Sequence, residues 1–161
     1  NSLVNCKQLI ERAGIPVEIV SCGGTSDYAI AGTFSGITEI QAGSYLLMDT
    51  SYLPFAQDFS PSLTVLATVI SKSAGRMVLD AGAKTMSGEK GLPSVKGIHG
   101  VQVTALHAEH TIIELLDPSV SIEVGDKVEI WVHYLDATVS LHRKMYGIRK
   151  EEVEEVFQIE A

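Results

Sequence analysis

The segment LTVLATVIS occupies residues 63–71, and after the turn Ala74-Gly75 the sequence continues RMVL at residues 76–79. Both segments are rich in Val, Ile and Thr, which favour β-strands. Five further segments share this composition and are separated by turn signals: 102–108, 111–116, 127–132, 137–141 and 153–159. Many short strands with regular turns predict an antiparallel barrel or sandwich. We therefore predict a mainly β chain with a β-rich C-terminal domain over residues 59–161.

The first 58 residues follow a different pattern. Apolar residues at helical spacing predict a helix over 2–13, and short strands are predicted at 17–20 and 37–40. Each strand is followed by a glycine-containing loop, a rhythm typical of parallel α/β folds. Two such units would leave sheet edges unpaired. We therefore expect residues 1–58 to be the last βα units of a β/α barrel, with roughly two hundred residues lying outside this chain.

Composition narrows the class of protein. The 161 residues are 45% hydrophobic and 20% charged, with a formal charge of −8. The apolar share excludes intrinsic disorder, and the acidic balance argues against general nucleic-acid binding. No stretch is long and apolar enough to span a membrane. Cys6 and Cys22 form no disulfide framework, so we expect a reducing, cytoplasmic location.

The two glycine loops are candidate phosphate sites. Gly23-Gly24-Thr25 follows the first predicted strand, and Gly43-Ser44 follows the second. Small residues let backbone N–H groups converge on a phosphate, and Thr25 adds a hydroxyl donor. Either loop taken alone could equally be an ordinary turn. Two in succession favour a site for the phosphate of a cofactor or substrate.

A polar cluster near the C-terminus is a candidate metal site. His133, Asp136 and His142 carry imidazole and carboxylate groups, which suit zinc or manganese. They could also decorate a polar strand face or a turn. On a regular strand His133 and Asp136, three residues apart, would face opposite ways, so a bulge or turn would be needed to join them.

Two other polar groups have simpler interpretations. His107, Glu109 and His110 lie between two predicted strands and most simply form a hairpin turn. Lys84 lies among small residues and is interpreted as a loop lysine, not as a cofactor-binding one.

Ordered motifs carry a family likeness along most of the chain. They are Ser21–Thr25, Gly36–Tyr45, Met48-Asp49, Leu79–Ser87, Glu109-His110, Val124–Asp126 and Asp136–His142. In this order they resemble D-threonine aldolases and D-serine dehydratases, which are fold type III (alanine-racemase-like) pyridoxal-phosphate enzymes.

The resemblance implies a β/α barrel that holds pyridoxal phosphate, a C-terminal β domain, and a homodimer whose active sites receive groups from both subunits. The loops Gly23-Gly24-Thr25 and Gly43-Ser44-Tyr45 would bind the cofactor phosphate. The lysine that binds the cofactor covalently would lie near the start of the barrel. It is therefore expected outside this chain, which alone would be inactive.

The resemblance also implies a metal site made by a His and, two residues later, a Cys or Asp. Alignment on Thr138-Val139 and His142 puts Asp136 at the second ligand position but Tyr134 at the first. His133 lies one residue too early. We name His133 and Asp136 as the candidate ligands of zinc or manganese. Either a local bulge brings His133 onto the first ligand position, or this protein has lost the metal of the family.

Three functions follow as hypotheses. With a metal, the parent enzyme would cleave D-3-hydroxy amino acids or eliminate water from D-serine. Without one, racemisation of alanine or a similar amino acid is the alternative. A non-catalytic β-barrel binding module is the third hypothesis.

Overall fold

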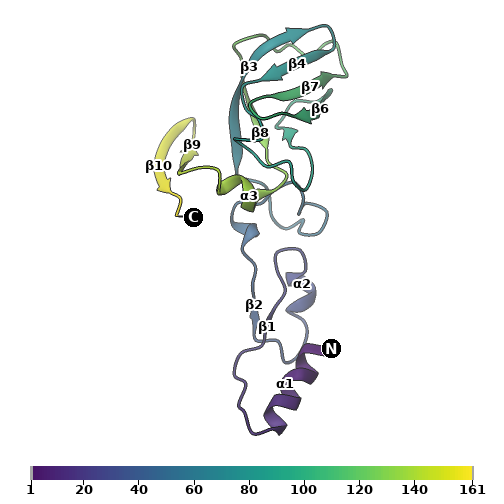
Figure 1. The fold of residues 1–161 in the computed structure, drawn as a ribbon, viewed down its shortest axis with the longest axis vertical. Helices are drawn as coiled ribbons and strands as arrows, with labels where there is room; N and C mark the ends of the chain where they lie inside the picture. The colour runs from purple at the N-terminus through teal and green to yellow at the C-terminus, as the bar shows by residue number, and fades with distance from the viewer. Residues whose placement is uncertain (1, 161) are drawn as a thin grey trace. The chain divides into compact units, whose positions relative to one another are not determined.

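The computed structural model describes residues 2–160, which divide into two compact units (Figure 1). The first unit comprises residues 2–46 and 52–60, and the second comprises residues 47–51 and 61–160. The short segment Leu47–Ser51 belongs with the second unit because its backbone is bonded there. The Thr50 N–H donates to the Val132 carbonyl at 3.1 Å, and the Leu47 carbonyl accepts the Ser62 N–H at 2.7 Å.

The second unit is built on a six-stranded antiparallel sheet in the order β5-β8-β3-β4-β7-β6. The strands are β3 (Thr64–Ser73), β4 (Arg76–Leu79), β5 (Ser94–Val95), β6 (Val101–Leu106), β7 (Thr111–Leu115) and β8 (Lys127–Trp131). The two end strands of this order, β5 and β6, lie side by side, so the sheet curls into a nearly closed barrel (Figure 1). The predicted mainly β fold with an antiparallel barrel is confirmed.

The barrel core follows from the two-residue period of the strands. On β3, Val65, Ala67 and Val69 are buried, whereas Leu66 and Ile70 point outward. The buried residues that cluster with them are Met77, Leu79, Ala81, Met86, Val103, Ile113, Ile122, Val128, Ile130 and Val132. Each large side chain buried here contributes about 1.5–3 kcal/mol of hydrophobic free energy. The barrel therefore has a core of its own.

The segment after the barrel corrects one sequence prediction. Residues 137–141 were expected to form a strand, but Leu135–Val139 form a short helix, α3. The buried Asp49 carboxylate accepts the Leu135 N–H at 2.7 Å, and the Thr138 hydroxyl donates to the Tyr134 carbonyl at 2.6 Å. These hydrogen bonds hold the first turn of the helix and outweigh the strand preference of Thr138 and Val139.

A two-stranded antiparallel hairpin ends the described chain. It consists of β9 (Lys144–Arg149), which the sequence did not predict, and β10 (Glu152–Gln158). Lys150 and Glu151 join the strands with φ angles of 51° and 67°, the left-handed conformation that tight hairpin turns require.

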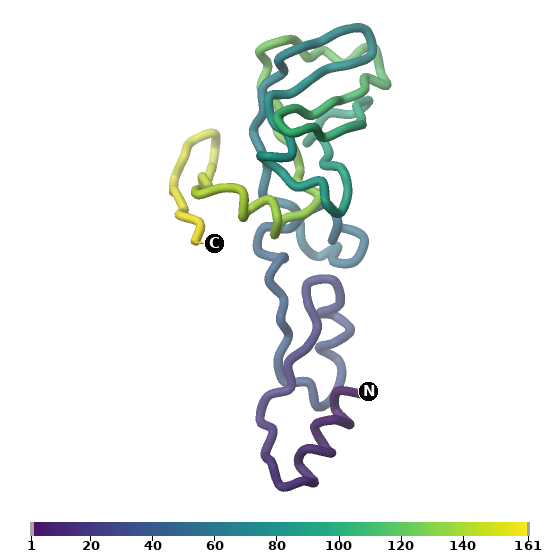
Figure 2. Tube along the Cα trace, viewed as in Figure 1, coloured from purple at the N-terminus to yellow at the C-terminus, as the bar shows by residue number. Residues whose placement is uncertain are grey.

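The first unit contains α1 (Ser2–Arg12), β1 (Ser21–Cys22), α2 (Tyr28–Ala31), β2 (Glu39–Ile40) and the 3-10 turn η1 (Ser44–Leu46). β1 and β2 pair in parallel, with α2 between them along the chain (Figure 2). The first strand lies at 21–22 and not at the predicted 17–20. Within 17–20, the hydrogen bonds to the second strand region all involve Val20: its carbonyl accepts the N–H groups of Thr38 and Glu39, and its N–H donates to the Thr38 hydroxyl at 2.8 Å.

No helix within residues 2–160 has the length and apolar character needed to cross a membrane.

Candidate functional site

The first glycine loop has a backbone that only glycine adopts easily. Gly23 has a φ of 76°, and a Cβ there would lie 2.9 Å from the Ala31 Cβ on α2. The next N–H, that of Gly24, donates to Asp27 Oδ1 at 2.7 Å. The Asp27 carboxylate thus fixes the loop, and the contribution of Gly24 to a site is its missing side chain and not its N–H.

A single hydrogen bond ties the two predicted phosphate loops together. The Thr25 side chain is buried, with 3% exposed, and its Oγ1 accepts the Tyr45 N–H at 3.1 Å. Thr25 comes from the loop after β1, and Tyr45 from the loop after β2. The structure therefore brings together the two loops that the sequence singled out.

The backbone donors of these loops are free to bind an anion. Within residues 2–160, the N–H groups of Thr25, Ser26, Gly43 and Ser44 donate to no protein acceptor. A Cβ added at Gly24 or Gly43 would meet nothing within 4 Å. Unpaired backbone N–H groups in loops with open space beside them can serve as donors to a phosphate group. The residues present fit a cofactor phosphate.

An aromatic cavity lies beside the loops. It measures about 230 Å³ and is lined by Thr25, Tyr28, Ile40, Ala42, Tyr45 and Phe59. The Phe59 ring packs against both tyrosine rings, with centroids 5.4 Å apart in each pair. The Tyr28 hydroxyl donates to the Asp58 carboxylate, and this hydrogen bond raises the pKa of Tyr28.

The sequence analysis missed Tyr28 and Phe59. Tyr28 could have been found, because it follows Thr25 by three residues at the start of a helix. The place of Phe59 depends on how the chain returns to the first unit, which local sequence does not reveal.

In the second unit, the His133 ring contacts two neighbouring residues. Its Nδ1 shares a hydrogen bond of 2.8 Å with the Thr50 hydroxyl. The other edge of the ring lies on the backbone of Gly91, where a Cβ would come 2.5 Å from His133 Cδ2 and 2.7 Å from Nε2. The imidazole is therefore held between Thr50 and Gly91.

The other polar residues near α3 have separate surroundings. Asp136 is exposed in the first turn of α3 and makes no hydrogen bond through its side chain to another described residue. His142 Nε2 bonds to the Thr85 carbonyl at 2.7 Å. Among residues 2–160, no group of three or more His, Cys, Asp or Glu side chains could hold a metal ion.

Tyr134 takes a distinctive position just before α3. The Lys90 ammonium lies over its ring, 3.9 Å from the centroid. No Asp or Glu within the described chain forms an ion pair with Lys90. This pair is a cation on an aromatic face, and the sequence analysis did not anticipate it.

The residues around 107–110 form a turn between β6 and β7. The His107 N–H donates to the His110 carbonyl at 2.8 Å, and the Lys84 ammonium lies 2.5 Å from Glu109 Oε1. This hydrogen bond and the opposite charge raise the pKa of Lys84. Both side chains are largely exposed, so the pair contributes little to stability.

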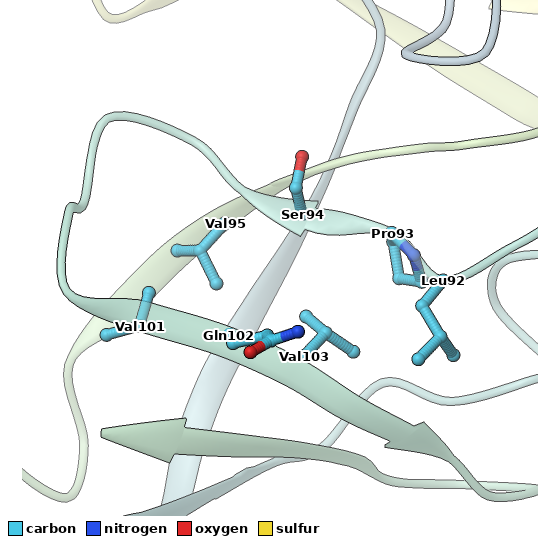
Figure 3. A pocket seen from close by; sticks show the side chains of 7 residues that line it. All are labelled: Leu92, Pro93, Ser94, Val95, Val101, Gln102 and Val103. Atoms are coloured by element: carbon cyan, nitrogen blue, oxygen red, sulfur yellow. The ribbon is translucent and has the colours of Figure 1, made fainter. Parts of the chain in front are cut away.

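A second cavity follows the seam of the barrel between β5 and β6 (Figure 3). It measures about 310 Å³ and is lined by Leu92, Pro93, Ser94, Val95, Val101, Gln102 and Val103. None of these side chains is charged, and the lining holds no imidazole or carboxylate that could activate the Ser94 hydroxyl, so the seam offers no catalytic group.

Comparison with known proteins identifies relatives of this arrangement. Residues 62–148 match the model of the family described as "Putative serine dehydratase domain". A D-threonine aldolase from Arthrobacter sp is 34% identical over 96% of this chain and 42% of its own length. A 3-hydroxy-D-aspartate aldolase from Paracoccus denitrificans (strain Pd 1222) is 31% identical over 94% of this chain and 41% of its own length.

Solved structures extend the comparison. The crystal structure of a D-threonine aldolase from Filomicrobium marinum matches with a TM-score of 0.89 and 27% identity, over 94% of this chain and 43% of that one. An alanine-racemase-like protein from Idiomarina loihiensis, with 22% identity and a TM-score of 0.82, covers 94% of this chain and 46% of its own, and supports the fold alone. The chain thus spans about two fifths of the length of the curated relatives it matches.

Proposed function

This chain belongs to the serine dehydratase domain family, and we propose that it forms the phosphate-binding part of a pyridoxal-phosphate enzyme that acts on D-amino acids. The observation that carries the proposal is the hydrogen bond from the Tyr45 N–H to Thr25 Oγ1. It joins two loops whose remaining backbone N–H groups have no acceptor among the described residues.

The chain would hold the cofactor through its phosphate. The N–H groups of Thr25, Ser26, Gly43 and Ser44 would donate to the phosphate oxygens, and the hydroxyls of Ser26 and Ser44 are further donors in the same loops. The aromatic cavity would shield the neighbouring apolar surface of the ligand from water. Pyridoxal phosphate, when bound, supplies an electron sink for charge that develops at the α-carbon of an amino acid.

The substrate class follows from the relatives. The two aldolases matched above act, by name, on D-threonine and on 3-hydroxy-D-aspartate, both of which are β-hydroxylated D-amino acids. We propose the same class here, with cleavage between the α- and β-carbons or loss of the hydroxyl group as the reaction. Racemisation of alanine or a similar amino acid is the alternative, and it is compatible with the surroundings of Tyr134.

The cysteines support a cytoplasmic location as part of this proposal. Cys6 is an exposed free thiol, and Cys22 is a half-buried one. Free thiols persist in a reducing compartment.

The hairpin β9–β10 supports the homodimer that we also propose. Its residues Tyr146, Ile148, Val153 and Val156 form cross-strand pairs, and all four are exposed. Strand β9 ends at the basic residue Arg149, which is followed by Lys150 in the turn. Strand β10 carries the acidic residues Glu152, Glu154 and Glu155. A ribbon with an apolar face, one basic end and one acidic strand is complementary to a second copy of itself.

Sedimentation over a range of concentrations tests the dimer. We expect the wild-type chain to dimerise, Ile148→Glu to be monomeric, and the exposed control Leu116→Glu to behave as wild type. A monomeric wild type, or a dimeric Ile148→Glu variant, would refute the proposed dimer surface.

Calorimetric titration with pyridoxal phosphate and with pyridoxal, which lacks the phosphate, tests the function. We expect pyridoxal to bind at least about tenfold more weakly, because charge-assisted hydrogen bonds to phosphate are lost. Gly24→Val and Gly43→Val should weaken the binding of pyridoxal phosphate to a similar degree, because each adds a branched side chain beside the backbone that would approach the phosphate, at a position where a Cβ meets no protein atom within 4 Å.

Ala29→Val is the matched control, since Ala29 is an exposed position on α2 in the same unit. It should leave the affinity unchanged. Equal affinities for pyridoxal phosphate and pyridoxal would show that these loops do not bind the cofactor phosphate. An unchanged affinity for pyridoxal phosphate in both glycine variants would show the same.

A further inference from the structure

The surroundings of α3 disagree with the metal site that the family resemblance implies. We infer that this chain does not bind a divalent metal at the start of α3, and that the Lys90 ammonium, held on the ring of Tyr134, is the cationic group there. The inference rests on the family assignment in the proposed function and deepens it, because it bears on the class of reaction.

The nearest imidazole is held by residues that lie outside α3. His133 Nδ1 is bonded to the Thr50 hydroxyl at 2.8 Å, and its Nε2 edge rests on Gly91. The Thr50 N–H also binds the Val132 carbonyl, so the backbone that precedes His133 is fixed as well. The local bulge that would bring His133 onto the ligand position is therefore absent; a helix that begins at Leu135 takes its place.

The residue at the ligand position is a poor donor for a metal. Tyr134 offers a phenol in place of an imidazole, and a phenol is not among the usual protein ligands of zinc. Asp136 is then the only carboxylate in the first turn of α3. A single carboxylate supplies only one of the two protein ligands that the family resemblance implies.

The positive charge of Lys90 beside Tyr134 disfavours the binding of a metal cation there. The Lys90 ammonium lies 3.9 Å from the centroid of the Tyr134 ring and has no ion-pair partner among the described residues. A dication placed at Tyr134 would meet this uncompensated positive charge and be repelled by it. The ammonium can instead neutralise an anionic group of a ligand, such as a carboxylate.

A lysine ammonium in place of a metal ion changes the reactions that this part of the protein can support. A metal polarises a substrate hydroxyl as a Lewis acid, whereas an ammonium acts only by charge and hydrogen bonding. Reactions that require no activation of a β-hydroxyl group, racemisation among them, are compatible with the Lys90–Tyr134 pair.

Zinc binding measured by competition with a chromophoric chelator tests the inference. The measurement uses the chain with Cys6→Ser and Cys22→Ser, because both thiols are free and would bind zinc themselves. We expect no stoichiometric zinc in this background. Tyr134→His should create a one-to-one site at least about tenfold tighter than any residual binding, because it adds a first imidazole ligand.

Three further variants identify which side chains would bind the zinc. Asp136→Ala added to Tyr134→His should abolish the new site. His133→Ala should have no effect on zinc binding. Tyr146→His, an exposed position on β9, is the matched control and should create no site.

Stoichiometric zinc in the background protein that Asp136→Ala or His133→Ala removes would overturn the inference. So would a folded Tyr134→His variant that gains no zinc, since Tyr134 would then not occupy the ligand position. Neither result depends on cofactor binding, so failure here is separable from failure of the phosphate site.

Discussion

The two units of the molecule distribute their apolar residues in opposite ways. The barrel buries a continuous core around Val69, Ile113 and Ile130, each with no exposed surface. In the first unit α1 buries no residue, and Leu9 and Ile19 are 63% and 64% exposed. The barrel thus carries its own stability, whereas the first unit carries the phosphate donors on a scaffold with little core.

The contrast separates the residues that stabilise the fold from the residues proposed to bind phosphate. Stability in a small protein comes mainly from apolar area removed from water. The phosphate loops need only a short parallel strand pair, one buried threonine and correctly placed glycines. The unit most important for the proposed function is therefore the less stable one, and the two properties should be separable by mutation.

The largest expected effect is in the barrel core. Ile113→Ala should lower the free energy of unfolding of the barrel by about 3 kcal/mol, because it leaves a cavity at a fully buried position. Urea unfolding followed by the fluorescence of Trp131, the one tryptophan of the chain, reports on the barrel directly.

Leu9→Ala on α1 is the matched comparison. It should cost less than about 0.5 kcal/mol, because Leu9 is exposed. Similar losses in the two variants would contradict the division between a core-bearing barrel and a core-poor first unit.

A slightly smaller effect is expected at Asp49. This carboxylate is 1% exposed and accepts hydrogen bonds from the Ser51 N–H, the Ser51 hydroxyl and the Leu135 N–H. Asp49→Ala leaves buried donors without acceptors and should destabilise the barrel by about 2 kcal/mol. Asp49→Asn keeps one carbonyl oxygen and should lose about half as much.

The helicity of α3, measured from backbone chemical shifts, should fall in Asp49→Ala. Pyridoxal phosphate affinity should not change, since the phosphate loops belong to the first unit. A loss of that affinity equal to the loss in Gly24→Val would show that the two units are not separable.

The smallest expected effect is a loss of barrel stability at low pH. A hydrogen bond from the Thr68 N–H lowers the pKa of Asp80, and a hydrogen bond from Lys96 lowers the pKa of Glu129. Carboxylates with lowered pKa values stabilise the fold above their usual pKa, and this contribution is lost as pH falls through the folded-state value.

Barrel stability should therefore decline below about pH 4, by less than about 1 kcal/mol from these two partly exposed groups. Asp80→Asn and Glu129→Gln should flatten that decline in a pH series of urea unfolding curves. An unchanged slope in both variants would show that other groups control acid stability.

Much of the fold was predictable because the barrel strands carry strong local signals. The segment LTVLATVIS and the turns at Ala74-Gly75 and Val124–Asp126 place β3, β4 and β8 within a residue or two. α3 was not predictable, because Thr138 and Val139 favour strands and the bond that starts the helix comes from Asp49, far away in sequence.

The candidate site also has features that the sequence predicts and features that it does not. The glycine loops were recognisable from Gly23, Gly24 and Gly43, whose positions after strands are visible in the sequence. The bond from Tyr45 to Thr25 and the contact of Lys90 with Tyr134 were not, because both join residues from different segments. Such pairings emerge only from the folded chain.

The most direct test of the account is an ¹H–¹⁵N correlation spectrum of the chain titrated with pyridoxal phosphate and, separately, with pyridoxal. We expect pyridoxal phosphate to shift the amide signals of Thr25, Ser26, Gly43 and Ser44, and pyridoxal to leave these four signals unchanged. The amide signal of Ile113, in the barrel core, should move with neither compound. Shifts centred on the barrel, or equal shifts of the loop amides with both compounds, would contradict the proposed phosphate site.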